Sequence, residues 1–349
     1  MSEEHALLAD TLERLFGDAF GRLDPKTARC DLDGALWKQV EELGLPLLLV
    51  PESTGGVGGG FEEAQPVARA LGRFAVPLPL CETLLAARLL AAAGIERPAG
   101  ALSLALRSEG SLAEDRFDGT LDAVPWGAEV AGVVAVLPGR AGPCAALLSP
   151  AAAAIERRPN LAGEPRDRLR FAGARATSAP APADAATLFD HAALLRTGQI
   201  AGALAAALER SIAHASSRVQ FGRTLSRFQA VQQQLAVMGE EVLAVDCAAA
   251  AAFAKADRGE AAFEIACARL RANLAIEIVA AGAHQIHGAI GFTREQDLRL
   301  FTQRLLAWRS ELGNDRHWAA RLGRDVVARG PEAFWPDLTD RADATGAAR

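Results

Sequence analysis

Residues 217–238 read SRVQFGRTLSRFQAVQQQLAVM and contain both a turn and the start of a long helix. In the first half a glycine follows Phe221, which is typical of a tight turn. In the second half apolar residues recur at alternating spacings of three and four, a pattern that predicts one buried helix face. This apolar seam consists of Phe228, Val231, Leu235, Met238, Val242, Val245 and Ala249.

Three more long helices are expected around this one. Residues 187–215 and 261–283 are free of proline and rich in alanine, the strongest helix former. Residues 298–312 repeat the three-and-four spacing. Four such segments favour a helix bundle, and small alanine surfaces also suit contacts between bundles in an oligomer.

The chain ahead of this bundle changes character once. Residues 1–98 contain amphipathic segments joined by short loops and predict an N-terminal helical domain. Residues 99–185 contain short apolar runs separated by Gly, Pro and Asp, which indicates a small β domain. We therefore expect a mainly α protein with a small middle β domain, a four-helix bundle over residues 186–330, and a loosely held tail over residues 331–349.

Composition excludes several classes of function. The 349 residues carry a net charge of −6, so no overall positive field is available for nucleic acid or an anionic membrane. Apolar runs fall short of the roughly 20 residues that span a bilayer, and the N-terminus lacks the pattern of a secretory signal. The five cysteines are odd in number and lack ligand spacing, which predicts reduced thiols and a cytoplasmic location. His284 and His287 lack further ligands at metal-site spacing, so no metal site is expected.

Residues 217–238 resemble a signature of the acyl-CoA dehydrogenase family, in which an Arg-x-x-Phe-Gly turn joins two bundle helices. Residues 284–301, HQIHGAIGFTREQDLRLF, resemble that family's second C-terminal signature. Residues 36–58, LWKQVEELGLPLLLVPESTGGVG, are similar to its usual helix, turn and Gly-rich loop. The resemblance thus covers most of the chain.

The resemblance implies FAD as the cofactor and assigns residues to it. The cation of an arginine suits a pyrophosphate, and the resemblance directs this turn toward the cofactor of a neighbouring subunit. The residues implied on the turn and the next helix are Arg218, Gln220, Phe221, Leu225, Phe228 and Gln229, and those implied at the adenine end are Gln285, Gly288 and Ala289. Arg218 and Gln220 could alternatively cap a helix turn, and Phe228 could belong to the core.

The resemblance also implies a carboxylate that removes the α proton of a thioester. Counting on from the family's Gly-Phe pair, here residues 291–292, the glutamate position falls on Leu312. Glu311 stands one residue earlier and is the candidate catalytic residue. On a continuing helix, however, Leu312 would point inward and Glu311 would be rotated by about 100° toward solvent. Some members carry the glutamate on the helix before the turn, where this chain has Ala192.

The β domain departs further from the family. The Thr, Ser and aromatic residues that usually hold the flavin ring have no counterpart in residues 100–185, where Trp126 could be a ring neighbour or a core residue.

Three hypotheses follow. The chain is a subunit of a heteromeric acyl-CoA dehydrogenase whose partner supplies the glutamate, as in members that oxidise bulky acyl-CoA side chains such as those of sterols. Alternatively, it is a homomeric enzyme that uses Glu311, or a non-catalytic scaffold or acyl-CoA-binding subunit. For an enzyme of this family, the resemblance implies electron-transfer flavoprotein as the electron acceptor.

Overall fold

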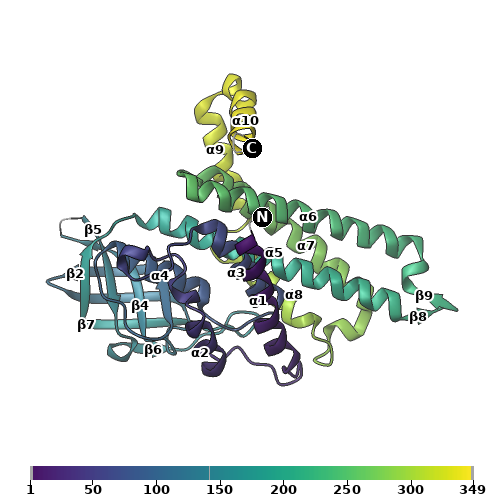
Figure 1. Ribbon diagram of the computed structural model, residues 1–349, viewed down its shortest axis with the longest axis horizontal. Helices are drawn as coiled ribbons and strands as arrows, with labels where there is room; N and C mark the ends of the chain where they lie inside the picture. The colour runs from purple at the N-terminus through teal and green to yellow at the C-terminus, as the bar shows by residue number, and fades with distance from the viewer. Residues whose placement is uncertain (1–2, 141, 347–349) are drawn as a thin grey trace.

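The computed structural model describes residues 3–140 and 142–346, which fold into a helical N-terminal region, a sheet and a helical C-terminal region (Figure 1). The N-terminal region confirms the predicted helices. One of them begins where the Asp33 carboxylate accepts hydrogen bonds from the amides of Ala35 and Leu36. The four helices are α1 (Glu3–Gly21), α2 (Gly34–Glu42), α3 (Phe61–Arg73) and α4 (Leu80–Ala92).

The middle region is a sheet with strand order β1-β4-β5-β7-β3-β2, and β6 pairs with β7. Among the described strands β1 and β4 run parallel, and the other paired strands are antiparallel. The register of β3 against β7 shifts between Leu121 and Val124, which marks a bulge. The strands are β1 (Leu102–Ala105), β2 (Ser108–Ala113), β3 (Arg116–Pro125), β4 (Gly132–Gly139), β5 (Gly142–Leu148), β6 (Ala154–Glu156) and β7 (Arg166–Pro180).

The C-terminal region confirms the four predicted bundle helices. They are α5 (Ala185–Ser217), α6 (Gln229–Arg258), α7 (Ala262–His287) and α8 (Leu298–Ser310). A short hairpin of β8 (Val219–Gln220) and β9 (Arg223–Thr224) joins α5 to α6. This hairpin lies at the opposite end of the molecule from the sheet (Figure 1).

Helix α5 takes part in both hydrophobic cores. Its first half packs with the N-terminal helices and the sheet, and its second half packs inside the bundle. Two glycines let the backbones of α3 and α5 touch: a Cβ at Gly72 would lie 1.8 Å from the carbonyl oxygen of Gln199, and one at Gly202 would lie 1.9 Å from that of Arg69. This approach fixes α5 against the N-terminal region.

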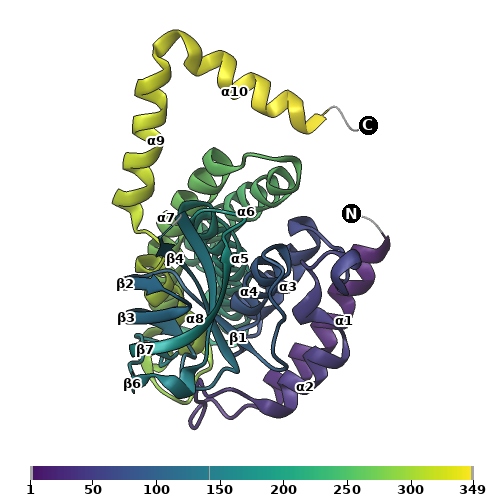
Figure 2. The ribbon, with the colours of Figure 1, turned by 90° about the vertical axis from the view of Figure 1, so that its left-hand side faces the viewer.

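The segment after Gly330 is helical. The loosely held tail predicted over residues 331–349 stays a prediction, and residues Pro331–Gly346 form helix α10, which packs against α9 (Asp315–Arg329). Pro331 is the first residue of α10, where its missing N–H costs nothing. Figure 2 shows α9 and α10 as an arm that stands clear of the body, and its Val327 and Trp335 are 81% and 70% exposed. Residues 347–349 lie outside the described part of the chain.

Within residues 3–140 and 142–346, no helix combines the length and the apolar character needed to cross a membrane. The positions of the helices and strands are compatible with domain boundaries at residues 98, 185 and 330, and we keep these boundaries as a proposal.

Gly202→Ala should destabilise the protein by about 1–3 kcal/mol or more, because the new methyl group collides with the backbone of α3. Gly239→Ala on α6 is the matched control, since the nearest atom to its Cβ position, on Leu208, is 4.0 Å away. That control should raise stability by about 0.5–1 kcal/mol. Thermal unfolding of both variants measures the difference, and equal melting temperatures would contradict the close approach.

Candidate active site

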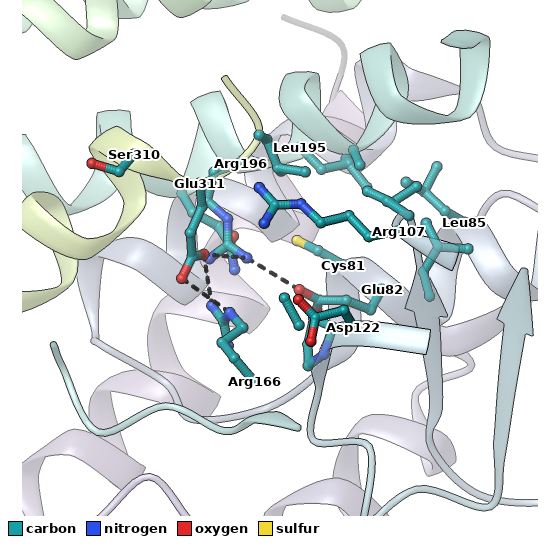
Figure 3. A pocket seen from close by; sticks show the side chains of 17 residues that line it. Cys81, Glu82, Leu85, Arg107, Asp122, Arg166, Leu195, Arg196, Ser310 and Glu311 are labelled. Carbon is teal, nitrogen blue, oxygen red and sulfur yellow. Dashed lines mark hydrogen bonds and ion pairs between the residues drawn. The ribbon is translucent and has the colours of Figure 1, made fainter. Parts of the chain in front are cut away.

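A cavity of about 240 Å³ lies between α4, α5, the sheet and the segment that follows α8 (Figure 3). Its polar lining comes from Glu82, Arg107, Asp122, Arg166, Arg196, Gln199, Ser310 and Glu311. Its remaining lining is Cys81, Leu85, Leu104, Leu106, Ala123, Pro125, Ala192, Leu195 and Leu312.

The structure brings the two alternative base positions together. Ala192 on α5 and Leu312 after α8 line the same cavity, although they are 120 residues apart in the sequence. Neither side chain can accept a proton at catalytic pH. The place where the resemblance puts the chemistry is therefore present as a cavity, without a base at either position.

The sequence predicted a helix over residues 298–312, but helix α8 ends before Glu311. Helix α8 ends at Ser310, Glu311 is extended, and Leu312 has a φ of +53°. Helix α7 holds this turn, because Arg269 Nη2 donates to the Glu311 carbonyl at 2.7 Å and Asn273 Nδ2 donates to the Gly313 carbonyl at 3.2 Å. Burial and nearby Arg196 lower the pKa of Arg269 to about 9, despite opposing carboxylates.

Glu311 consequently lies beside Leu312 at the cavity instead of facing solvent, which corrects the expected rotation. Arg166 binds its carboxylate through two hydrogen bonds, from Nε to Oε1 at 3.0 Å and from Nη2 to Oε2 at 2.9 Å (Figure 3). Asn160 Nδ2 donates to Oε1 at 2.9 Å, and Arg196 Nη2 lies 3.8 Å from Oε2. Both carboxylate oxygens are thus already engaged.

A second carboxylate completes this network. Glu164 is fully buried and accepts hydrogen bonds from Arg166 Nη2 at 3.0 Å, Arg304 Nε at 3.1 Å and Trp308 Nε1 at 2.8 Å. Burial alone raises the pKa of Glu164, but Arg166, Arg304 and Arg196 outweigh burial and lower the pKa to about 2. The same two carboxylates raise the pKa of Arg166 against the effect of its burial.

This arrangement makes Glu311 a poor proton acceptor. Burial raises its pKa, but the charges of Arg166 and Arg196 and the hydrogen bonds of Arg166 outweigh burial, so the pKa lies below its usual range. A carboxylate with a low pKa and a bidentate arginine partner takes a proton from carbon weakly. Its catalytic role stays a prediction, and the geometry favours a structural role.

The bulge in β3 shapes the wall opposite α5. It places Asp122 and Ala123 at the cavity, and Ala123 has a φ of +54°. Trp126, which follows on the same strand connection, is buried and donates from Nε1 to the carbonyl of Cys30 at 3.1 Å. Trp126 is therefore a core residue and does not line the cavity.

The residues assigned to FAD gather elsewhere, at the hairpin end of the bundle. Arg218 and Gln220 are exposed, and Phe221 is 90% exposed at the hairpin tip with a φ of +52°. Phe228 is half-buried, with its ring 6.2 Å from that of Phe221, and Leu225 is also half-buried. The other exposed members at this end are Gln229, Gln285, Gly288 and Ala289.

A groove between α6 and α7 contains one of these residues. It is lined by Gln285 and also by Ala230, Gln233, Gln234 and Met238. The sequence analysis did not assign Gln233 and Gln234, which belong to no motif of their own. The amides of such a groove suit the polar groups of a dinucleotide.

The cavity and the hairpin cannot serve one flavin within this chain. Ala192 and Arg218 are separated by 26 residues of α5, which corresponds to about 39 Å along the helix. That is longer than an extended flavin dinucleotide. If the hairpin residues bind the pyrophosphate and adenine of FAD, as the resemblance implies, the ring of that flavin would lie outside this chain's own cavity.

Comparison with known proteins agrees with this architecture. Residues 2–97 match the N-terminal domain of acyl-CoA dehydrogenases and residues 183–324 match the C-terminal domain. The chain belongs to the acyl-CoA dehydrogenase family. It is an oxidoreductase of the acyl-CoA dehydrogenase type, and the cofactor of this type is FAD.

Relatives and solved structures cover nearly the whole chain. Acyl-CoA dehydrogenase IpdE2 of Mycobacterium tuberculosis is 30% identical over 329 residues, which are 93% of this chain and 98% of that protein. A variant of the Tcur3481–Tcur3483 steroid ACAD has a TM-score of 0.85 at 25% identity, over 94% of this chain and 98% of that one. The ChsE4–ChsE5 complex from Mycobacterium tuberculosis has a TM-score of 0.85 at 21% identity, over 95% of this chain and 99% of that one, and shows the fold.

The free energy of unfolding should depend on pH in the acidic range because of Glu164. Because its folded pKa is depressed to about 2, its contribution is complete above about pH 5 and is lost as the pH falls toward 2. Glu164→Gln should therefore lower the free energy of unfolding by about 3–5 kcal/mol at about pH 7, and the gap to wild type should narrow at about pH 3. Denaturant unfolding at both values measures this gap. Glu96→Gln, an exposed carboxylate, is the control, and a gap that widened in acid would contradict the assignment.

Proposed function

We propose that this chain is one subunit of a heteromeric acyl-CoA dehydrogenase. It supplies the hairpin residues around Arg218 to the FAD of a related partner subunit, and the partner supplies the glutamate base. The observation that carries the proposal is the cavity itself, where Ala192 and Leu312 occupy both base positions and Arg166 binds Glu311.

The reaction proposed for the assembly is the oxidation of an acyl-CoA thioester to the 2-enoyl-CoA. A carboxylate of the partner takes the α proton, and FAD, when bound, accepts the β hydrogen with its electron pair. This chain's contribution would be to bind and orient: Arg218 would hold the pyrophosphate by its charge, and the exposed Phe221 would offer an apolar contact to the cofactor.

Similarity to a steroid ACAD composed of two gene products supports the heteromeric state and a bulky acyl-CoA, such as one derived from a sterol, as substrate. We also propose electron-transfer flavoprotein as the electron acceptor, on the basis of the family resemblance. A cytoplasmic location is proposed from the five cysteines, none of which forms a disulfide in the described part of the chain.

Two alternative functions can be distinguished from this proposal by experiment. A homomeric enzyme would need Glu311 to leave Arg166 before it could act as a base. A non-catalytic scaffold would retain the fold without binding flavin in the assembled state. The experiment measures the flavin absorbance of two samples, the chain purified alone and the chain co-expressed with a related dehydrogenase subunit. Each sample then receives acyl-CoA under anaerobic conditions. Bleaching only in the mixture supports the proposal, and bleaching by the chain alone contradicts it.

Arg218→Ala should lower the flavin content of the assembled complex at least tenfold at limiting FAD, since it removes a charge-assisted contact to pyrophosphate. Thermal unfolding should change little, because Arg218 is exposed. The ratio of flavin to protein absorbance measures the effect. Arg324→Ala on α9 removes the same charge from another exposed site and should keep the flavin. Equal flavin content in both variants would remove Arg218 from the site.

Glu311→Gln in the assembled complex should leave the rate of flavin reduction per bound flavin within about twofold, because the proposed base belongs to the partner. The variant should also be less stable, since the Arg166 charge loses its main partner. Single-turnover flavin bleaching measures the rate independently of protein yield. A loss of about a thousandfold or more would favour the homomeric enzyme.

A further inference from the structure

The cavity contains polar atoms that lack a partner within the described residues. Glu82 Oε2, Arg196 Nε and Gln199 Oε1 are buried without a hydrogen bond, and all three side chains line the cavity. Their residues are 9%, 5% and 5% exposed, respectively. A buried polar group without a partner costs about 1–3 kcal/mol. A guest that accepts from the nitrogen and donates to at least one of the two oxygens is therefore favoured.

Part of the remaining wall is apolar. Leucine side chains from α4, β1 and the residue after it, α5 and the segment after α8 line the cavity together with two alanines. These residues are Leu85, Leu104, Leu106, Leu195, Leu312, Ala123 and Ala192. A pocket that combines unpaired polar atoms with leucine side chains fits a compact apolar body that carries one polar group.

Charge balance determines the charge of the guest. Arginine already pairs with each carboxylate at the cavity: Arg196 with Glu82 at 3.2 Å, Arg166 with Glu311 at 2.9 Å and Arg168 with Asp122 at 2.7 Å. Arg107 is exposed where the cavity meets a second groove, so water solvates its charge. A cationic guest would lose its hydration without gaining an unpaired carboxylate, and an anionic guest would gain only Arg107, whose charge water already solvates.

We propose that this cavity binds a neutral, compact apolar alcohol. The hydroxyl oxygen accepts a hydrogen bond from Arg196 Nε, and the hydroxyl hydrogen is donated to Glu82 Oε2 or Gln199 Oε1. Because Ala192 and Leu312 offer no base, the guest is held without being transformed. This site goes beyond the proposed function, since binding here requires neither flavin nor a partner subunit.

Binding to the full chain is tested with four probes that share one ring: cyclohexylmethanol, cyclohexanecarboxylate, cyclohexylmethylamine and methylcyclohexane. Saturation-transfer NMR with titration should show saturable binding of the alcohol, with a dissociation constant on the order of millimolar or tighter for so small a molecule. Both ions should bind at least tenfold more weakly. A preference for either ion, equal binding of the hydrocarbon, or no binding of any probe would overturn the proposal.

Variants locate the site. Ala192→Phe fills the cavity and should abolish binding of the alcohol, whereas Ala186→Phe, the same change at an exposed position of the same helix, should leave binding intact. Gln199→Leu keeps the size of the side chain and removes one acceptor, so it should reduce the preference for the alcohol over methylcyclohexane several-fold. Thermal unfolding identifies any variant that fails to fold. If Ala192→Phe fails to fold, the binding preference of Gln199→Leu decides whether the alcohol occupies this cavity. If folded Ala192→Phe still bound the alcohol, the alcohol site would lie elsewhere. The flavin content of the assembled complex tests the proposed function separately.

Discussion

Arg166 binds two carboxylates that come from different parts of the chain, and this contact joins the sheet to the helices. Glu164 precedes β7, while Glu311 follows α8, and the hydrogen bonds from Arg166 to both are 3.0 Å or shorter. Removing one member would leave a buried charge without compensation, which is far more costly than losing an exposed ion pair. The positions of Arg166 and Glu311 at the cavity therefore depend on this network.

The same network explains why a chain with the acyl-CoA dehydrogenase fold can have a cavity without a free carboxylate. Where a dehydrogenase would need a free carboxylate, this chain has one that stabilises the junction between its regions, so stability and proton transfer make opposite demands on Glu311. Helix α5 separates the cavity from the proposed cofactor contact at Arg218. Its first half borders the cavity and its last turn presents Arg218 to solvent, so sequence change at one end leaves the other end intact.

The helices could be predicted because their information is local. The seam from Phe228 to Ala249 lies on α6, and alanine-rich, proline-free segments became α5 and α7. The surroundings of Glu311 could not be predicted, because its partners Asn160 and Arg166 are 151 and 145 residues away and form no pattern with it. The apolar seam of α8 wrongly suggested that the helix continued, whereas it ends at Ser310, where the Arg269 side chain of α7 donates to the Glu311 carbonyl. Helix α10 was not predicted either, because the sequence analysis described residues 331–349 only as a loosely held tail.

The projecting arm gives the molecule an unusual optical property. The chain has five tryptophans and no tyrosine. Four of the indole rings are buried, and Trp335 on α10 is the exposed one. Fluorescence that a water-soluble quencher can reach therefore originates from Trp335 on α10, while shielded fluorescence originates from the four buried rings. Without any label, the emission spectrum distinguishes an arm surrounded by water from an arm covered by another protein.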